Sequence, residues 1–186
     1  LGMDISALGL IDPSNLPNRN FFQDMARFYF MLRWFKGVRL VVTNVGAAAA
    51  ANVRVEIELP SFDGVQVLDS SGMPDPPRKR VSLGGNSLFE SIKPALRRKP
   101  GEVVVVEDNQ RIKIEIDCDS LQPGRRVWSE MFFVGKAETG ELSFPGRILA
   151  DNVSPPKEFT LTAMVTVTRT DMTLDRLLAL PEPKND

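Results

Sequence analysis

Few residues in this 186-residue sequence are able to do nucleophilic or acid–base chemistry. It contains no histidine and a single cysteine, Cys118, which removes the commonest general base and every Ser-His or Cys-His nucleophile pair. Cys118 alternates in phase with three isoleucines, so we expect its thiol to point into the core as a small hydrophobe. A lone cysteine also excludes an internal disulfide or a multi-cysteine metal site, which fits a reducing compartment.

The acidic residues do not form a recognisable metal or glycosidase site. Asp117 and Asp119 flank Cys118, and Glu107-Asp108 ends another apolar run, but the sequence has no Asp-x-Asp-x-Asp-Gly calcium loop. Glycosidase carboxylates must face each other across a cleft, and 24 acidic residues offer candidates without selecting a pair. We therefore expect no catalytic residue, no metal and no cofactor, and an enzyme on a sandwich fold is the least favoured alternative.

Basic residues cluster locally although the whole chain is balanced, with 23 basic and 24 acidic residues. If Val103–Glu107 and Arg111–Cys118 form an antiparallel hairpin, two of the clusters reach the same end of the domain, where they could contact phosphate. Nearby acids such as Glu102 also fit a second interpretation, in which the clusters are solubilising loops. The candidate nucleic-acid residues are Arg97, Arg98, Lys99, Arg125 and Arg126.

A helix is predicted from Asn20 to about Phe35. At about 100° per residue, one apolar stripe forms that we expect to pack on the sandwich; it comprises Phe21, Met25, Phe28, Leu32 and Phe35. Phe30 and Trp34 lie on the opposite, polar side. Large aromatic residues in that position either cover a second surface of the same chain or serve as anchors for another protein, and we take Phe30 and Trp34 as the candidate protein-interaction residues. A two-fold homodimer is the default assembly.

Strict alternation of apolar and polar residues predicts strands at Val53–Leu59 and Ile112–Cys118. Each is expected to have one face in water, and Glu56 lies on that face of the first strand. A third alternating run, Phe159–Thr168, has threonine on one side, which makes it the next candidate binding surface if it forms a sheet edge. Further strands are expected at Val38–Val45, Val65–Leu68, Val103–Glu107, Val127–Val134 and Phe144–Asp151. Turn residues, among them Asp63-Gly64, Asp108-Asn109, Pro123-Gly124 and Pro155-Pro156, separate these strands. Seven or eight strands without regularly interposed helices favour an antiparallel sandwich.

Two short helices are also predicted. Ser87 and Glu90 have the spacing of a capping box that opens a helix through Ile92. A terminal stretch from Thr173 to Leu180 is expected to form about two helical turns.

The segments Val42–Gly46, Ala47–Ala51 and Asn52–Leu59 resemble the opening hairpin of CARDB-like, immunoglobulin-fold adhesion or accessory domains. Leu121–Ser129 and Gly146–Asn152 are similar to the later strands of bacterial or archaeal accessory domains that follow Schlafen-type, AlbA-like modules. The resemblance implies an immunoglobulin-like fold and brings no catalytic motif with it.

The predicted fold class is all-β: an immunoglobulin-like antiparallel β-sandwich with an N-terminal helix and short helical insertions. We assign an arm and helix to residues 1–36, the sandwich to 37–170, and a short helix with a polar tail to 171–186. No apolar run reaches the roughly 18 to 20 residues of a spanning helix, and no signal peptide is evident, so we expect a cytoplasmic location within a larger protein. The expected function is a non-catalytic protein-interaction or oligomerisation module, with no membrane partner and only weak nucleic-acid binding.

Overall fold

The strictly alternating segments form the centre of the larger sheet. In the computed structural model, which describes residues 16–61, 64–81, 98–108 and 111–181, β4 (Ala50–Pro60) pairs antiparallel with β8 (Arg111–Leu121). The inward-facing residues of both strands, Ile57 and Ile114 among them, are buried. Both predicted strands are therefore confirmed.

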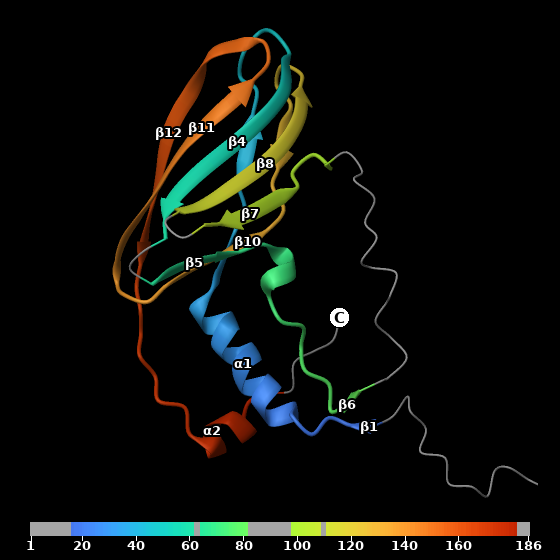
Figure 1. Ribbon diagram of the computed structural model, residues 1–186, viewed down its shortest axis with the longest axis vertical. Coiled ribbons are helices and arrows are strands. Elements are labelled where there is room, and N and C mark those ends of the chain that lie inside the picture. Colours follow the sequence, from blue (N-terminus) through green and yellow to red (C-terminus); the bar gives the residue numbers. More distant parts are fainter. Residues whose placement is uncertain (1–15, 62–63, 82–97, 109–110, 182–186) are drawn as a thin grey trace, which may run out of the picture.

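Five antiparallel strands make up this sheet, and their order runs from one exposed edge to the other (Figure 1). The order is β12 (Val153–Val165), β11 (Gly140–Ala150), β4, β8 and β7 (Val103–Glu107). β7 and β8 form the expected antiparallel hairpin, with Val103 opposite Ile116. Cys118, at the far end of β8, is 1% exposed, as predicted.

Shorter strands form the second layer and share one hydrophobic core with the five-stranded sheet. They are β2 (Lys36–Val38), β10 (Phe132–Lys136) and β5 (Val65–Leu68) in one sheet, and β3 (Val41–Thr43) with β9 (Arg126–Trp128) in another. Two small elements lie apart from this core: the pair β1 (Leu16–Pro17) with β6 (Arg80–Val81), and a 3₁₀ turn at Ser70–Gly72. The all-β antiparallel fold is thus as the sequence predicts.

Two predicted strands of the second layer are each broken in the structure. The expected strand Val38–Val45 divides into β2 and β3, and Val127–Val134 divides into β9 and β10. Ser129 occupies the break and is 1% exposed. Its hydroxyl accepts from the Leu40 amide at 2.9 Å and donates to the Glu130 carbonyl at 2.7 Å, while its own amide donates to the Leu40 carbonyl at 2.8 Å. These bonds join the two pieces where the regular ladder stops.

The expected turn at Pro155-Pro156 is wrong, because both prolines lie within β12. Proline cannot donate to a ladder and is tolerated on an edge strand, and β12 is the outermost strand of the described sheet. The end of β12 at Val165 is also earlier than the predicted Thr168. The turn at Pro123-Gly124 is confirmed by a φ of +74° at Gly124, whereas Asp63 and Asn109 lie outside the described residues.

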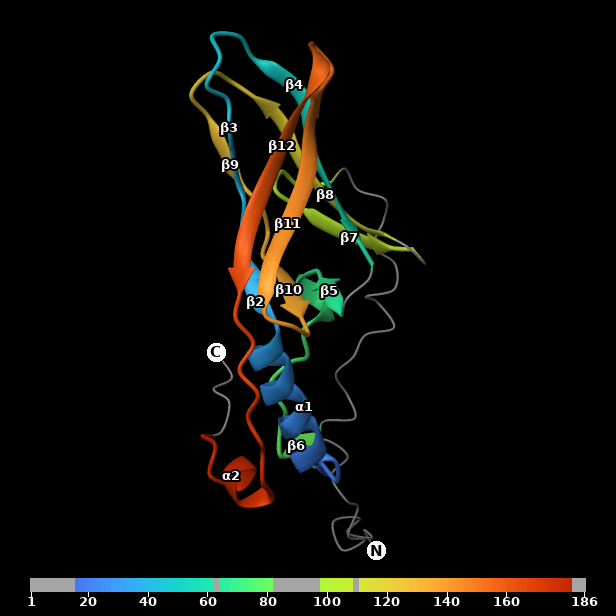
Figure 2. The ribbon, with the colours of Figure 1, turned by 90° about the vertical axis from the view of Figure 1, so that its left-hand side faces the viewer.

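Helix α1 (Phe21–Trp34) continues from the sheets and lies beyond their end, beside α2 (Leu174–Leu178) (Figures 1 and 2). Its stripe does not pack on the sandwich as a unit: Phe21 and Met25 pack with Leu177 of α2 in a separate cluster, and Leu32 is 46% exposed. Because α1 extends away from the edge of the sheet, the apolar residues of its first half pack against the C-terminal segment rather than against the sandwich.

The C-terminal helix is present as predicted, and the Thr173 side chain caps it by accepting from the Arg176 amide at 3.3 Å. The helix predicted at Ser87–Ile92 lies outside the described residues. Neither α1 nor α2 has the length and apolar character needed to cross a membrane.

Candidate functional site

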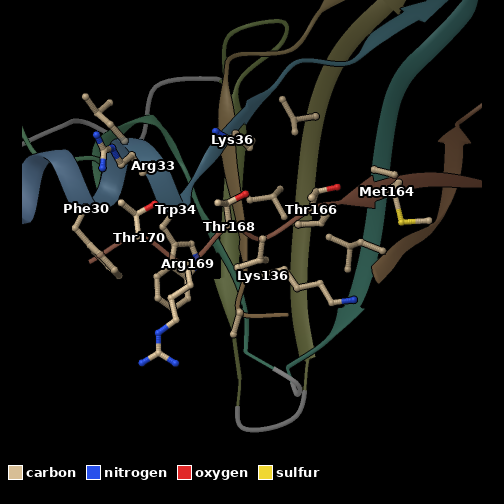
Figure 3. A pocket seen from close by; sticks show the side chains of 18 of the residues that line it. Phe30, Arg33, Trp34, Lys36, Lys136, Met164, Thr166, Thr168, Arg169 and Thr170 are labelled. Atoms are coloured by element: carbon tan, nitrogen blue, oxygen red, sulfur yellow. The ribbon is translucent and has the colours of Figure 1, made fainter. Parts of the chain in front are cut away.

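A groove lies where the sandwich meets α1. It has a volume of about 1400 Å³. One side is formed by α1 and β2, and the other by the end of β12 and residues 166–172, which connect β12 to α2 (Figure 3). The groove therefore joins segments from both ends of the sequence.

Apolar side chains form the floor of this groove. Ile57 and Phe132, which belong to the sandwich core, reach it from β4 and β10. Other apolar lining residues are Val38, Leu40, Val134, Leu142, Phe144, Ala163 and Val165. Ile57 and Phe132 are almost completely excluded from water. Val38, Leu40 and Val165 are partly exposed, and apolar surface of this kind is stabilised when another molecule covers it.

Strand edges border the groove on both sides. β12 is outermost in the five-stranded sheet and β2 is outermost in the three-stranded sheet, as far as the described strands show. Edge strands normally carry charges or proline that prevent pairing with other chains. In β12 those features, Pro155 to Glu158, lie in the first half of the strand, whereas Thr160–Thr168 contains neither a charge nor a proline. The half of the edge next to the groove is therefore unprotected, and it faces the viewer in Figure 2.

Residues 166–172 are held at their two ends. The Val167 amide donates to the Thr139 hydroxyl at 2.9 Å, and the Arg176 guanidinium donates to the Asp171 carbonyl at 3.2 Å. Between these points, the backbone of residues 168–170 makes no hydrogen bond to other described residues. Its amides and carbonyls are consequently available to another chain.

The charges on the groove have one sign. Four cationic side chains line it and no acidic one does, within the described part of the chain: Arg33, Lys36, Lys136 and Arg169. The Lys136 ammonium donates to the Glu141 carbonyl at 2.9 Å. The other three make no ion pair or side-chain hydrogen bond with any described residue. Since the whole chain has nearly equal numbers of acids and bases, this positive surface is a local property of the groove.

Phe30 and Trp34 both line the groove, but they differ in their surroundings. The Phe30 ring is 53% exposed and meets the Trp34 ring edge-on at 5.0 Å. Trp34 is half-buried and lies on β10, where a Cβ added to Gly135 would be 2.2 Å from its Nε1. Trp34 therefore covers a surface of its own chain instead of being free for a partner, and Phe30 is the accessible aromatic residue of the two. The buried Trp34 Nε1 has no acceptor among the described residues.

The five candidate nucleic-acid residues do not gather into one described patch. Arg97 lies outside the described residues, and the Arg98 guanidinium pairs with Glu115 at 3.0 Å. Arg125 and Arg126 are exposed in and beside the turn after β8. From Glu115 to that turn, β8 extends over a distance of about 20 Å. Lys99 is exposed near Arg98, so Arg98 and Lys99 form one location and Arg125 and Arg126 another.

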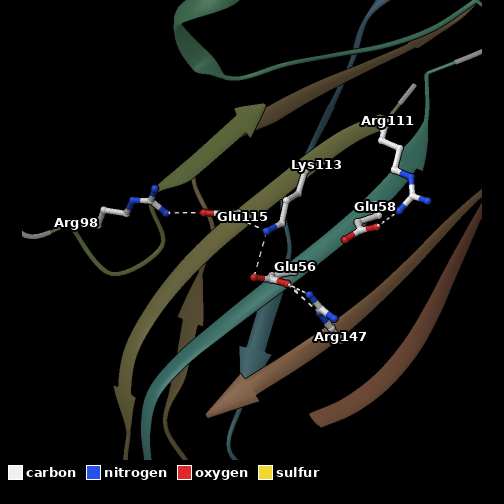
Figure 4. A network of polar contacts seen from close by, with 7 residues as sticks. All are labelled: Glu56, Glu58, Arg98, Arg111, Lys113, Glu115 and Arg147. Carbon is white, nitrogen blue, oxygen red and sulfur yellow. Dashed lines mark hydrogen bonds and ion pairs between the residues drawn. The ribbon is translucent and has the colours of Figure 1, made fainter. Parts of the chain in front are cut away.

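An ion-pair network covers the outer face of the larger sheet (Figure 4). Glu56, expected on the wet face, is 7% exposed because Arg147 and Lys113 cover it. Arg147 approaches Glu56 to 2.6 Å and Lys113 to 3.3 Å, and Lys113 also pairs with Glu115 at 2.9 Å. With Arg98, the network extends across β11, β4 and β8 to the residues before β7.

These contacts stabilise the charged forms. Burial of Glu56 opposes ionisation, but hydrogen bonds from Arg147 and Lys113 outweigh it and hold the pKa of Glu56 below its usual value. Hydrogen bonds from Lys113 and then Arg98 lower the pKa of Glu115. Every cation in this network meets a carboxylate, which indicates a structural role rather than a binding site.

The surroundings of Cys118 and of the acidic residues considered as metal ligands indicate a structural role. Burial raises the pKa of Cys118 to about 11, with a further contribution from Asp117, so the thiol remains protonated and unreactive near neutral pH. Among residues 16–61, 64–81, 98–108 and 111–181, no group of three or more acidic, histidine or cysteine side chains could hold a metal ion.

Sequence reasoning missed the groove cations. Lys36, Lys136 and Arg169 come from three separate segments, and no motif links them. The one usable signal was the uncharged run Phe159–Thr168, which we considered only as a strand edge.

Comparisons with known proteins give no further assignment: no family model, no curated protein and no solved structure matches the chain.

Proposed function

We propose that this chain is a non-catalytic protein-interaction module that holds part of another polypeptide in the groove between α1 and β12. The observation that carries the proposal is the combination of an apolar floor with two bordering strand edges that pair with no other described strand. Backbone edges recognise polypeptides through main-chain hydrogen bonds, and alternate side chains then occupy pockets. We further propose an immunoglobulin-like accessory domain of a larger cytosolic protein as its context.

Nucleic-acid binding receives less support as an alternative. Arg98 already pairs with Glu115. Beside the exposed Arg126, Trp128 is 53% exposed on the same strand, whereas single-stranded nucleic acids stack successive bases on several aromatic side chains.

Selection from a random displayed-peptide library tests the proposal. The full chain should select peptides that bind the unmodified protein and protect the amides of residues 160–170 from hydrogen exchange. Replacing the groove aromatic, Phe30→Ser, should reduce their affinity by about tenfold. The matched control is Phe22→Ser, because Phe22 is equally exposed at 54% on the same helix but does not line the groove.

Two results would contradict the proposal. The first is that no peptide is enriched. The second is that enriched peptides bind equally well to Phe30→Ser and leave residues 160–170 unprotected, which would place the binding surface elsewhere on the chain.

A further inference from the structure

We infer that the occupant of the groove is an extended, acidic segment of a partner protein that adds as a new strand to the edge of β12. This inference rests on the proposed function and specifies the chemistry of the partner. It combines three independent features of the groove: the open strand edge, the apolar floor and the unmatched positive charge.

The edge requires an extended ligand. The unprotected part of β12 and its continuation, from Thr160 to Thr168, offers a run of backbone groups with no charge or proline to repel a strand. A strand placed there spans about 30 Å for nine residues. Its side chains would alternate, with one set toward the groove floor and the other toward solvent.

The floor and rim then decide which side chains fit. The partly exposed residues of the floor, Val38, Leu40 and Val165, favour apolar β-branched side chains on the inner set. Arg33, Lys36 and Arg169 are exposed at the rim and lack carboxylate partners in the described chain. Glutamate or aspartate side chains on the partner segment would supply carboxylates to these three cations.

A second copy of this chain fits the groove less well. Its own unprotected edge, Thr160–Thr168, contains no acid at all, so it would leave the three rim cations unmatched. A fatty acid would match the charge and the floor, but it would leave the edges of β12 and β2 unpaired. Of these three occupants, the partner segment alone satisfies all three features.

Synthetic peptides provide the probe. A nine-residue peptide in which valine alternates with glutamate should bind the full chain at least about tenfold more tightly than the same peptide with glutamine, at low ionic strength. The difference should shrink in about 0.5 M salt, because surface charges are screened. The peptide with lysine should bind more weakly than either.

Variants locate the charge effect. Changing both Arg33→Glu and Arg169→Glu leaves two cations and two carboxylates on the groove, so the preference for the glutamate peptide should be lost. Arg27→Glu is the matched control, since Arg27 is an exposed cation of α1 that does not line the groove; it should leave the order of affinities unchanged.

Backbone methylation tests strand addition. A strand that pairs along one edge donates only alternate amides, so N-methylation of one alternate set should abolish binding and methylation of the other set should not. A peptide bound as a helix or through side chains alone would not show this alternation.

The inference is overturned if the glutamate and glutamine peptides bind equally, if methylation shows no alternation, or if sedimentation of the full chain alone shows a dimer that Thr162→Lys dissociates. Binding of laurate, a fatty acid, in the groove without binding of any peptide would also overturn it.

The proposed function survives separately if library-selected peptides bind the groove but are neither acidic nor extended. It fails together with the inference if no peptide binds there.

Discussion

The outer face of the larger sheet and the groove both carry cations, but only the sheet supplies carboxylates for them. On the sheet, Arg147, Lys113 and Arg98 contact Glu56 or Glu115. In the groove, Arg33 and Arg169 contact no carboxylate within the described chain. The first arrangement is complete without another molecule and serves stability, whereas the second gains contacts only when something binds. Changes to the sheet should therefore act on folding, and changes to the groove should act on binding.

The largest effect on folding is expected in the core between the two layers. Ile114→Ala removes a side chain that is 0% exposed, so the free energy of unfolding should fall by about 2 to 4 kcal/mol through lost burial and a cavity. Urea unfolding followed by circular dichroism measures it. Val106→Ala is the control, because Val106 is 51% exposed on β7, and its cost should stay below about 1 kcal/mol. Equal costs would mean that the assignment of inner and outer faces is incorrect.

Ser129→Ala tests the hydrogen bonds that connect the two broken strands of the second layer. The buried hydroxyl accepts from the Leu40 amide and donates to the Glu130 carbonyl, and its removal leaves that amide without its partner. The free energy of unfolding should fall by about 1 to 3 kcal/mol. Ser143→Ala, at an exposed site on β11, should change it little. If the two variants are equally stable, water replaces the hydroxyl at the break.

Glu56→Gln removes the centre of the ion-pair network. Because Arg147 and Lys113 remain 51% and 34% exposed and can return to water, we expect a cost of about 1 to 2 kcal/mol, below that of a fully buried pair. The pKa values of Glu56 and Glu115 are lowered by folding. Their contribution is therefore full above the unfolded pKa, about 4.3, and is lost as pH falls through the lower folded values.

Unfolding measured from pH 7 to pH 3 should accordingly show a smaller loss of stability on acidification for Glu56→Gln than for the unmodified chain. Glu138→Gln, at an exposed residue outside the network, should follow the unmodified curve. A Glu56→Gln curve parallel to that of the unmodified chain would show that the network does not depend on ionised Glu56.

The smallest effect on folding is expected from the groove. Phe30→Ser should change the free energy of unfolding by no more than about 0.5 kcal/mol, since the ring is 53% exposed. Trp34→Ser should cost more, because the indole lies against Gly135. Thermal unfolding of both variants distinguishes the contribution of Phe30 to stability from that of Trp34. Unfolding of Phe30→Ser would show that the groove belongs to the core and would remove the contrast with the sheet.

Periodicity predicted the elements whose faces differ in polarity. The alternation in β4 and β8 and the aromatic stripe of α1 were each sufficient to predict the element, because the burial of one face is repeated at every second or third to fourth residue. The same local rule failed at Pro155-Pro156. A proline pair signals a turn in isolation, but an edge strand does not need the missing amides.

Partners in space could not be predicted in the same way. Glu56 was expected in water because its position alternates with buried residues, yet Arg147, which is distant in the sequence, covers it. Trp34 was predicted as an anchor for another protein, but the absence of a side chain at Gly135 admits the indole against β10. Neither contact can be recognised from the order of apolar and polar residues near Glu56 or Trp34.

The sequence by itself determined that this chain forms antiparallel strands with a buried cysteine, and that β12 has an uncharged half, because local residue order controls which face of a strand is apolar. Only the tertiary structure decided that this uncharged edge lies beside Arg33, Lys36 and Arg169 over an apolar floor. The physical reason is that a groove is made by the packing of segments far apart in the chain, and their relative positions depend on the whole core rather than on any one of them.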